Sequence, residues 1–213
     1  LSHAHESHPI VIMRQIAVLF VIGSALVAAC GKVDPQEHVK RGTEYVDQKK
    51  YEEGIVELRT ALQSDPRLAD ARLKLADAYL ATGKPAEALQ ELVRAADLLP
   101  KDAAVQLRAA KILLLARSYT DSKARAERAI AIDPKNAEAY VVAGNALAGL
   151  SDLDNALAQF DKALEVDETS VDSYIGIGAI QGTRKQTPDA EASFLKAVSV
   201  SPKSVRPQLA LAN

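Results

Sequence analysis

The chain has 213 residues, of which 48% are hydrophobic and 25% are charged, and its formal net charge at pH 7 is −2. This composition is typical of a folded helical protein and excludes a largely disordered chain, while the near balance of charge argues against nucleic-acid binding. A single cysteine excludes an internal disulfide, and the low aromatic content of 4% leaves few side chains on which bases could stack.

Residues 1–12 precede Met13, the single methionine of the chain. We expect this segment to be either an extended start of a signal peptide or sequence upstream of the true start. It contains His3, His5 and His8, and clustered imidazoles can bind zinc or nickel. Because the segment lies ahead of an expected cleavage site, the mature protein would not keep it, and we predict no metal site there.

Residues 13–29 combine a basic start with an apolar run, from Ile16 to about Val27, that is too short to span a bilayer comfortably. This pattern is typical of a secretory signal peptide. Its end, the letters VAAC finishing at Cys30, resembles the bacterial lipobox, in which the cysteine is acylated and becomes the first residue of the mature protein. The resemblance implies lipid attachment at Cys30. The alternatives are an ordinary signal peptide followed by an incidental cysteine, or an uncleaved anchor.

A lipid at Cys30 implies a bacterial membrane-anchored protein, in the periplasm or on the outer membrane, and several acyl chains on one residue suffice for stable anchoring. Residues 30–34 then form a short tether. Under the proteobacterial sorting rule, Gly31 after the cysteine implies the outer membrane. Because no long linker intervenes before Pro35, the first of the sequence repeats that begin at this residue are expected to lie close to the membrane surface.

From residue 35 to residue 204 the sequence repeats at an interval of 34 residues, without insertion or deletion. The five units are 35–68, 69–102, 103–136, 137–170 and 171–204. Position 27 of each unit is alanine: Ala61, Ala95, Ala129, Ala163 and Ala197. Two apolar stripes at helical spacing, separated by a polar break such as Thr82-Gly83-Lys84, predict a helix, a turn and a helix in every unit.

Small residues at positions 8 and 20 of each unit would let its two helices approach closely. A larger side chain at position 24, such as Leu58 or Phe160, would fill the space beside them. Proline at position 32, present in all units but the fourth, cannot continue the second helix and turns the chain back. One helical pair cannot bury its apolar face alone, so we expect the pairs to stack.

This pattern resembles the tetratricopeptide repeat, a 34-residue helical hairpin with small residues at positions 8, 20 and 27 and proline at 32. The resemblance covers residues 35–204, about four-fifths of the chain. It implies an all-α fold, a right-handed superhelical solenoid of helix-turn-helix repeats. Arg72 and Gln106 depart from the motif at position 4, where Tyr140 and Tyr174 supply the usual aromatic residue.

Residues 205–213 reproduce the first nine positions of a sixth unit and include the apolar letters LALA. A terminal capping helix needs a polar outer face, which this segment lacks. We therefore expect the intact protein to continue with more repeats or with another domain.

After Cys30 the sequence contains one histidine, His38, and no further cysteine, which excludes nucleophile–base pairs built on those residues. Acidic residues fall where the repeat presents solvent or helix ends, where the helix dipole favours them. Gly176, Gly178 and Gly182 miss the spacing of the dinucleotide fingerprint and are better explained by close helix packing. The sequence predicts no catalytic residues, no cofactor and no enzymatic activity.

The family resemblance implies a concave groove lined by the first helix of each unit, in which partner peptides bind. It assigns nine residues to that groove: Leu73, Lys74, Asp77, Leu107, Arg108, Lys111, Val141, Asn145 and Ile175. The aliphatic residues at position 5 of four consecutive units would form an apolar floor between flanking charges, suited to an extended or helical peptide. Alternatively, position 5 belongs partly to the core.

The subclass of this family that binds chaperone tails holds a C-terminal carboxylate with two basic residues and two asparagines. Among the corresponding positions only Arg108 fits this clamp, which argues against chaperone-tail recognition.

These features predict a lipid-anchored, non-catalytic protein–protein interaction scaffold of the bacterial cell envelope. Its expected partners are other envelope proteins or peptide segments and the membrane, with no nucleic acid and no small-molecule substrate. The run KRGTEYVDQKKYEEGIVELRTALQSDP resembles lipoproteins associated with exosortase (PEP-CTERM) surface sorting, and assembly lipoproteins of pilus and outer-membrane biogenesis are comparable. Alternatively, the repeats recruit substrates for a larger envelope enzyme whose catalytic domain lies beyond Asn213.

Overall fold

The computed structural model describes residues 34–212. The histidines near the start, the predicted signal peptide and the predicted lipid site Cys30 lie outside the described residues.

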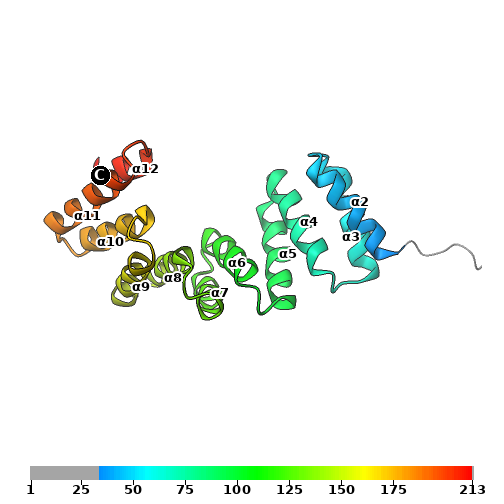
Figure 1. Ribbon diagram of the computed structural model, residues 1–213, viewed down its shortest axis with the longest axis horizontal. Helices are drawn as coiled ribbons and strands as arrows, with labels where there is room; N and C mark the ends of the chain where they lie inside the picture. The colour runs from blue at the N-terminus through cyan, green and yellow to red at the C-terminus, as the bar shows by residue number, and fades with distance from the viewer. Residues whose placement is uncertain (1–33, 213) are drawn as a thin grey trace, which may run out of the picture.

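Helical hairpins follow one another along the described part of the chain, which contains no strand (Figure 1). The hairpins are α2 (Pro35–Asp47) with α3 (Tyr51–Ser64), α4 (Ala69–Ala81) with α5 (Pro85–Leu98), α6 (Ala103–Leu115) with α7 (Tyr119–Ile132), α8 (Ala137–Gly149) with α9 (Leu153–Val166), and α10 (Val171–Thr183) with α11 (Thr187–Val200). A single helix, α12 (Val205–Ala212), follows them. Each hairpin lies within one 34-residue unit of the sequence.

Side-chain caps mark the start of most of the first helices of the units. Asp102 accepts a hydrogen bond from the Val105 backbone N–H at 3.0 Å, and asparagine and serine do the same for α8 and α10. These bonds satisfy backbone donors that have no partner inside the helix. The turn to the second helix uses a left-handed residue at position 15 of every unit: Lys49, Gly83, Arg117, Ser151 and Lys185. Thus the polar break predicted from the sequence is a tight turn with one reversed residue.

Within a hairpin, a glycine at position 8 packs directly on the large side chain at position 24. A Cβ atom placed on Gly144 would lie 2.8 Å from Cε1 of Phe160, and one placed on Gly42 would lie 2.6 Å from Cγ of Leu58. These separations are too short for non-bonded carbon atoms. The close approach expected from the small residues is therefore present in the structure.

Polar residues at position 4 bind the loop that ends the preceding unit. Three of them donate to the backbone carbonyl at position 32: Arg72 to Pro66, Tyr174 to Glu168, and Gln208 to Pro202. Gln106 is fully buried and donates to the carbonyls of Ala96 and Leu99. Because a buried carbonyl without a donor is costly, the departures from the aromatic motif residue still serve the joint between units.

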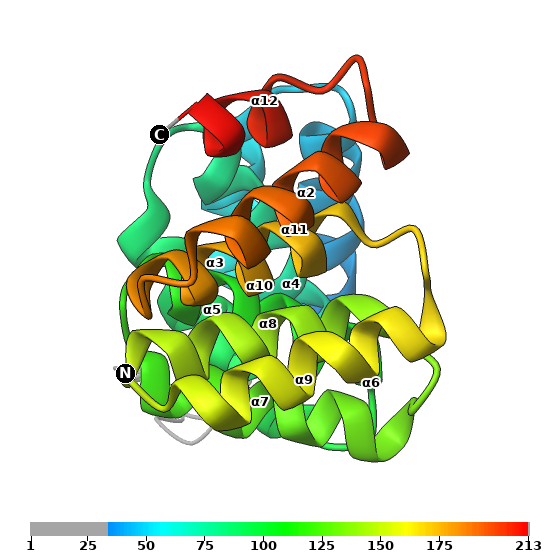
Figure 2. The ribbon, with the colours of Figure 1, turned by 90° about the vertical axis from the view of Figure 1, so that its left-hand side faces the viewer.

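The stack curves with its first helices on the inside. Cα atoms of consecutive first helices approach within 8 Å at every joint except that between α4 and α6, whereas no consecutive second helices of the described part do so. Elements that lie closer together occupy the smaller radius of a curved stack. The result is a right-handed superhelical solenoid, seen from its C-terminal end in Figure 2.

Candidate functional site

The inner surface of the solenoid, which we call the concave groove, is formed by α4, α6, α8 and α10. All nine residues predicted to bind a peptide lie on these four helices. They occupy three different environments: the packed layer beneath the surface, a series of ion pairs, and a hollow between α8 and α10.

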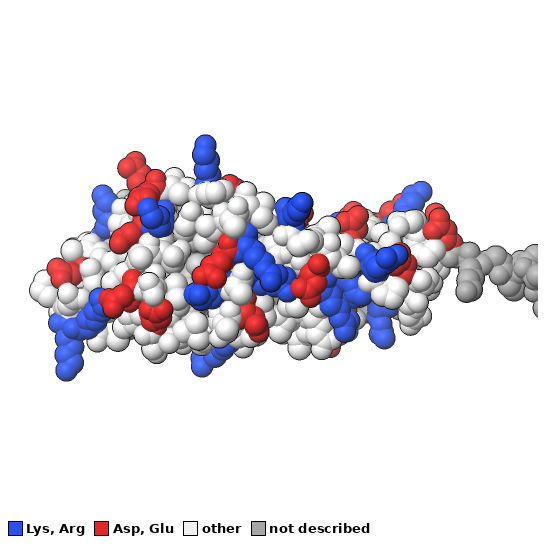
Figure 3. Space-filling view, turned by 90° about the horizontal axis from the view of Figure 1, so that it is seen from below, with Lys and Arg blue, Asp and Glu red and all other residues white. Residues whose placement is uncertain are grey.

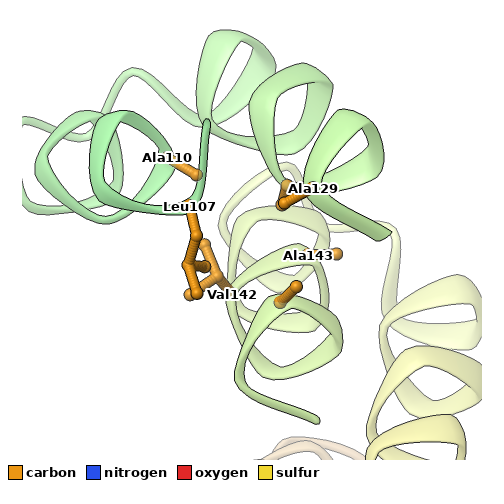
Figure 4. Close-up of a cluster of buried hydrophobic side chains, with 7 residues drawn as sticks. Leu107, Ala110, Ala129, Val142 and Ala143 are labelled. Atoms are coloured by element: carbon orange, nitrogen blue, oxygen red, sulfur yellow. The ribbon is translucent and has the colours of Figure 1, made fainter. Parts of the chain in front are cut away.

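The aliphatic row at position 5 lies mostly in the packed layer. Leu107 and Val141 are each only 6% exposed, while Leu73 and Ile175 are half-buried. Leu107 packs against Val142 in a cluster shared by α6, α7 and α8 (Figure 4). The row therefore joins consecutive units and supports the groove from below more than it lines it.

Charged groove residues pair between consecutive first helices. The Lys74 ammonium lies 3.1 Å from a carboxylate oxygen of Asp47, and that of Lys111 lies 2.5 Å from Glu138. Arg108 and Asp77 form a third pair of this kind. The partners are roughly half exposed, so each pair contributes only about 0–1 kcal/mol and can be exchanged for charges of a ligand. On the face seen in Figure 3, acidic and basic side chains likewise alternate instead of forming one large area of a single sign.

Two leucines stand exposed at the ends of α4 and α6. Leu115 is 84% exposed and Leu80 is 47% exposed, and Leu114, which precedes Leu115 in the sequence, is half-buried. Leu80 is at position 12 of the second unit and Leu115 is at position 13 of the third, on two of the helices that form the groove. These side chains add an apolar edge to a part of the groove whose charges are already paired.

A hollow of about 300 Å³ opens between α8 and α10, and we call it the Phe160 hollow. Phe160 and Ile180 form its floor, and both are almost fully buried. The other lining residues are small or polar: Asn145, Ala148, Ser151, Gly176, Ala179 and Thr183, with Leu153 at one side. An apolar floor beneath a few polar groups suits one large apolar side chain of a ligand. Of the nine predicted residues, only Asn145 lines this hollow.

The Phe160 hollow exists because position 6 of the fifth unit is Gly176. The earlier units carry larger residues there: Lys40, Lys74, Arg108 and Val142. A Cβ atom on Gly176 would overlap the ring of Phe160, so the helix can approach the ring only with glycine at this place. Sequence reasoning missed both residues as parts of a site. The available signal was a glycine where every other unit has a larger side chain.

A second hollow, of about 420 Å³, lies between the N-terminal ends of α8, α10 and α12. Val141 lines it together with Glu138 and Asp172, and Arg206 lies 2.6 Å from the Asp172 carboxylate. Asp167 is on its rim, where hydrogen bonds from the Thr169 hydroxyl and backbone N–H hold the pKa of that carboxyl below its ordinary value. This end of the groove is therefore polar, and the Asp167 carboxyl on its rim is ionised at neutral pH.

Two sequence profiles described as "Tetratricopeptide repeat" match the chain, one over residues 45–112 and the other over residues 107–172. Together they span more than half of it. The chain belongs to the tetratricopeptide repeat family. Among curated protein sequences, none matches.

Solved tetratricopeptide repeat structures share the fold. YrrB, described as a protein with an unusual peptide-binding site, is 19% identical with a TM-score of 0.74, covering 86% of this chain and 94% of its own. MamA from Desulfovibrio magneticus RS-1 is 17% identical with a TM-score of 0.69, covering 80% and 97%. A thermophilic protein of the same repeat class from Thermus thermophilus is 17% identical with a TM-score of 0.59, covering 84% and 97%. At these identities the likeness concerns the fold.

None of the family profiles and solved structures named above indicates a catalytic family. Within residues 34–212, no group of three or more His, Cys, Asp or Glu side chains is arranged to hold a metal ion. Among the helices of this same range, none is both long enough and apolar enough to cross a bilayer.

Proposed function

We propose that this tetratricopeptide repeat chain is a non-catalytic scaffold that binds segments of partner proteins in its concave groove. The observation that carries the proposal is the Phe160 hollow, because it offers a ready-made place for one apolar side chain, and helix α8 at its edge also carries Glu138 of the exchangeable pair with Lys111. A suitable ligand is an extended or helical segment with a large apolar residue and flanking charges of both signs.

The direction of the groove favours a segment several residues long. Exposed Leu80 and Leu115 lie on α4 and α6, the Phe160 hollow lies between α8 and α10, and the charged pairs lie along the first helices. A single amino acid would engage only one of these features. A peptide that runs along the inner helices would engage all three, which is the recognition mode of a groove built for a chain segment.

Filling the Phe160 hollow is expected to weaken peptide binding at least about tenfold, a loss of about 1.4 kcal/mol. Ala179 lines the hollow and is exposed, so Ala179→Phe would occupy the space without disturbing the core. Peptides would be selected from a displayed library on the unaltered protein, and their dissociation constants measured by fluorescence anisotropy.

The matched control is Ala192→Phe, which makes the same change at an exposed alanine of α11 outside the hollow. It should leave the dissociation constants unchanged. Equal affinity of the Ala179→Phe variant and the unaltered protein for every selected peptide would refute the hollow as the binding site.

The proposal includes a lipid anchor at Cys30 and a role in the bacterial cell envelope. Its support is the VAAC ending after an apolar run and the short distance to the repeats, since only residues 31–34 separate Cys30 from α2. A scaffold held so close to a membrane would collect envelope proteins there. Assembly, export and surface sorting, including exosortase-associated sorting, are processes that use such a scaffold.

Replacing Cys30 by serine is expected to move the protein from the membrane fraction to the soluble fraction of bacteria that express the full chain. Serine cannot accept the thioether-linked lipid, so incorporation of labelled palmitate should also be lost. Membrane retention of the variant in the absence of a lipid label would show that something other than an acylated cysteine holds the protein.

A further inference from the structure

A second open groove lies on the outer side of the solenoid, between α3 and α5, and we call it the outer groove. Its volume is about 550 Å³. The flanking helices are second helices of their units, which lie on the larger radius, and the floor is formed by α4 at positions 4, 7 and 11. The outer groove therefore opens away from the concave groove and does not share its lining residues.

The floor of the outer groove combines aliphatic side chains with the buried Arg72–Glu91 pair, and its rim carries exposed cations. Leu75 and Ile55 are buried in the floor, with half-buried Leu62 beside them. The lining contains four cations, Arg59, Arg72, Lys84 and Arg94, against two carboxylates, Glu87 and Glu91. An aliphatic floor with an excess of positive charge above it complements a ligand that is acidic and partly apolar.

The four cations that line the outer groove differ in whether a carboxylate already neutralises them. Glu91 is bound on one side by Arg72 at 2.5 Å and on the other by Arg94 at 3.1 Å. Within residues 34–212, by contrast, neither Arg59 nor Lys84 has a carboxylate at ion-pair distance, and both side chains are exposed. These two cations are available to carboxylates of another molecule.

At the next joint along the stack, between α5 and α7, an ion pair connects the two second helices. There Arg125 of α7 reaches Asp97 of α5 at 2.5 Å, and its guanidinium also donates to the buried Gln106 amide. The residue of α3 that corresponds to Asp97 is Gln63, which carries no charge. The joint between α3 and α5 therefore has no acid at this place on α3, and its internal carboxylate, Glu91, stands at the position of Arg125 and is bound by Arg72.

Tyr79 adds a hydrogen-bond donor to the floor. Its ring is half-buried, and burial raises the pKa of the phenol above its ordinary value, so the hydroxyl stays protonated. It lies in the same lining as Arg59 and Lys84 and can donate to a carboxylate held by them.

We propose that the outer groove binds an acidic segment of a second partner protein, with carboxylates at Arg59 and Lys84 and an aliphatic side chain over Leu62 and Leu75. The concave and outer grooves would then be occupied at the same time. One protein could in this way hold two partners on opposite sides of its second unit.

The test uses a fluorescein-labelled twelve-residue peptide of repeated Glu-Glu-Leu and measures its binding by anisotropy. Reversing both free cations, Arg59→Glu with Lys84→Glu, is expected to weaken binding at least about tenfold. The matched control reverses two exposed cations outside the outer groove, Arg128→Glu with Lys135→Glu, and should leave the affinity unchanged. Ala179→Phe should also leave it unchanged, because that residue lies in the concave groove.

Three results would overturn the proposal. The first is equal affinity of the Arg59/Lys84 double variant and the unaltered protein, with unchanged circular dichroism. The second is equal binding of a Lys-Lys-Leu or a Glu-Glu-Ser peptide, since that would remove the charge or the aliphatic requirement. The third is binding of phosphatidylglycerol vesicles through Arg59 and Lys84 without binding of the acidic peptide, which would identify a lipid surface in place of a protein segment.

If the charge reversals unfold the protein, the pair Arg59→Gln with Lys84→Gln is measured instead, with the same expectations.

Discussion

Replacing Phe160 by alanine is expected to lower the free energy of unfolding by about 3–5 kcal/mol. The ring is 1% exposed and packs against Gly144 of its own hairpin and against Gly176 of the next unit. Its loss would leave a cavity that cannot collapse, because both glycines sit on helix backbones that the rest of the joint holds in place. Since each repeat is stabilised by its neighbours, the joint between the fourth and fifth units should weaken most.

This loss would be measured by urea denaturation followed by circular dichroism. The matched control is Phe194→Ala, the same change at position 24 of the fifth unit, where the ring is only half-buried. A smaller loss is expected there. If Phe160→Ala cost no more than Phe194→Ala, the close packing of the two glycines on the Phe160 ring would not be an important source of stability.

Replacing Arg72 by alanine is expected to lower the free energy of unfolding by about 3 kcal/mol, the low end of the cost of breaking a buried ion pair. Arg72 and Glu91 are both buried and lie 2.5 Å apart, and Arg72 also donates to the Pro66 carbonyl. Removing the guanidinium leaves a buried carboxylate and a carbonyl without their donor. Arg94 still contacts Glu91 and keeps the loss from being larger.

The partner substitution separates this cost from simple loss of packing. Arg72→Met combined with Glu91→Leu removes both charges and retains the volume, so it should recover most of the stability lost in Arg72→Ala. Arg67→Ala is the surface control, because Arg67 is exposed and lies 3.9 Å from Asp65; it should change stability by less than about 0.5 kcal/mol. The interpretation fails if Arg72→Ala is as mild as Arg67→Ala, or if the double variant is no more stable than Arg72→Ala.

Both substitutions also bear on the proposed function, because each residue forms part of a surface that we propose to bind a partner. Phe160 is the floor of the hollow in the concave groove, and Arg72 lies in the floor of the outer groove. The residues that join neighbouring units thus shape the surfaces on either side of the stack. Variants that test binding are better made at exposed rim residues such as Ala179 and Lys84, where folding is not at stake.

The sequence by itself determined the fold of the repeats. A solenoid unit contacts only its neighbours, so a pattern that recurs every 34 residues specifies which helices meet, and no long-range pairing has to be inferred. Glycine at position 8 and a large residue at position 24 predicted the contact that Gly144 makes with Phe160. Alternating apolar stripes and polar breaks likewise predicted two helices and a turn in each unit.

The tertiary structure alone decided where the surfaces open and which charges are free. The Phe160 hollow needs Gly176 of one unit above the ring of another, and the outer groove is lined by Gln63 where the next unit has Asp97. It also showed that Leu107 and Val141 lie beneath the groove surface. The physical reason is that burial, ion pairing and hollows depend on side chains from neighbouring units at distances of a few ångströms. The repeat pattern gives the residues that all units share, whereas the Phe160 hollow is formed by Gly176, a residue in which one unit differs from the others.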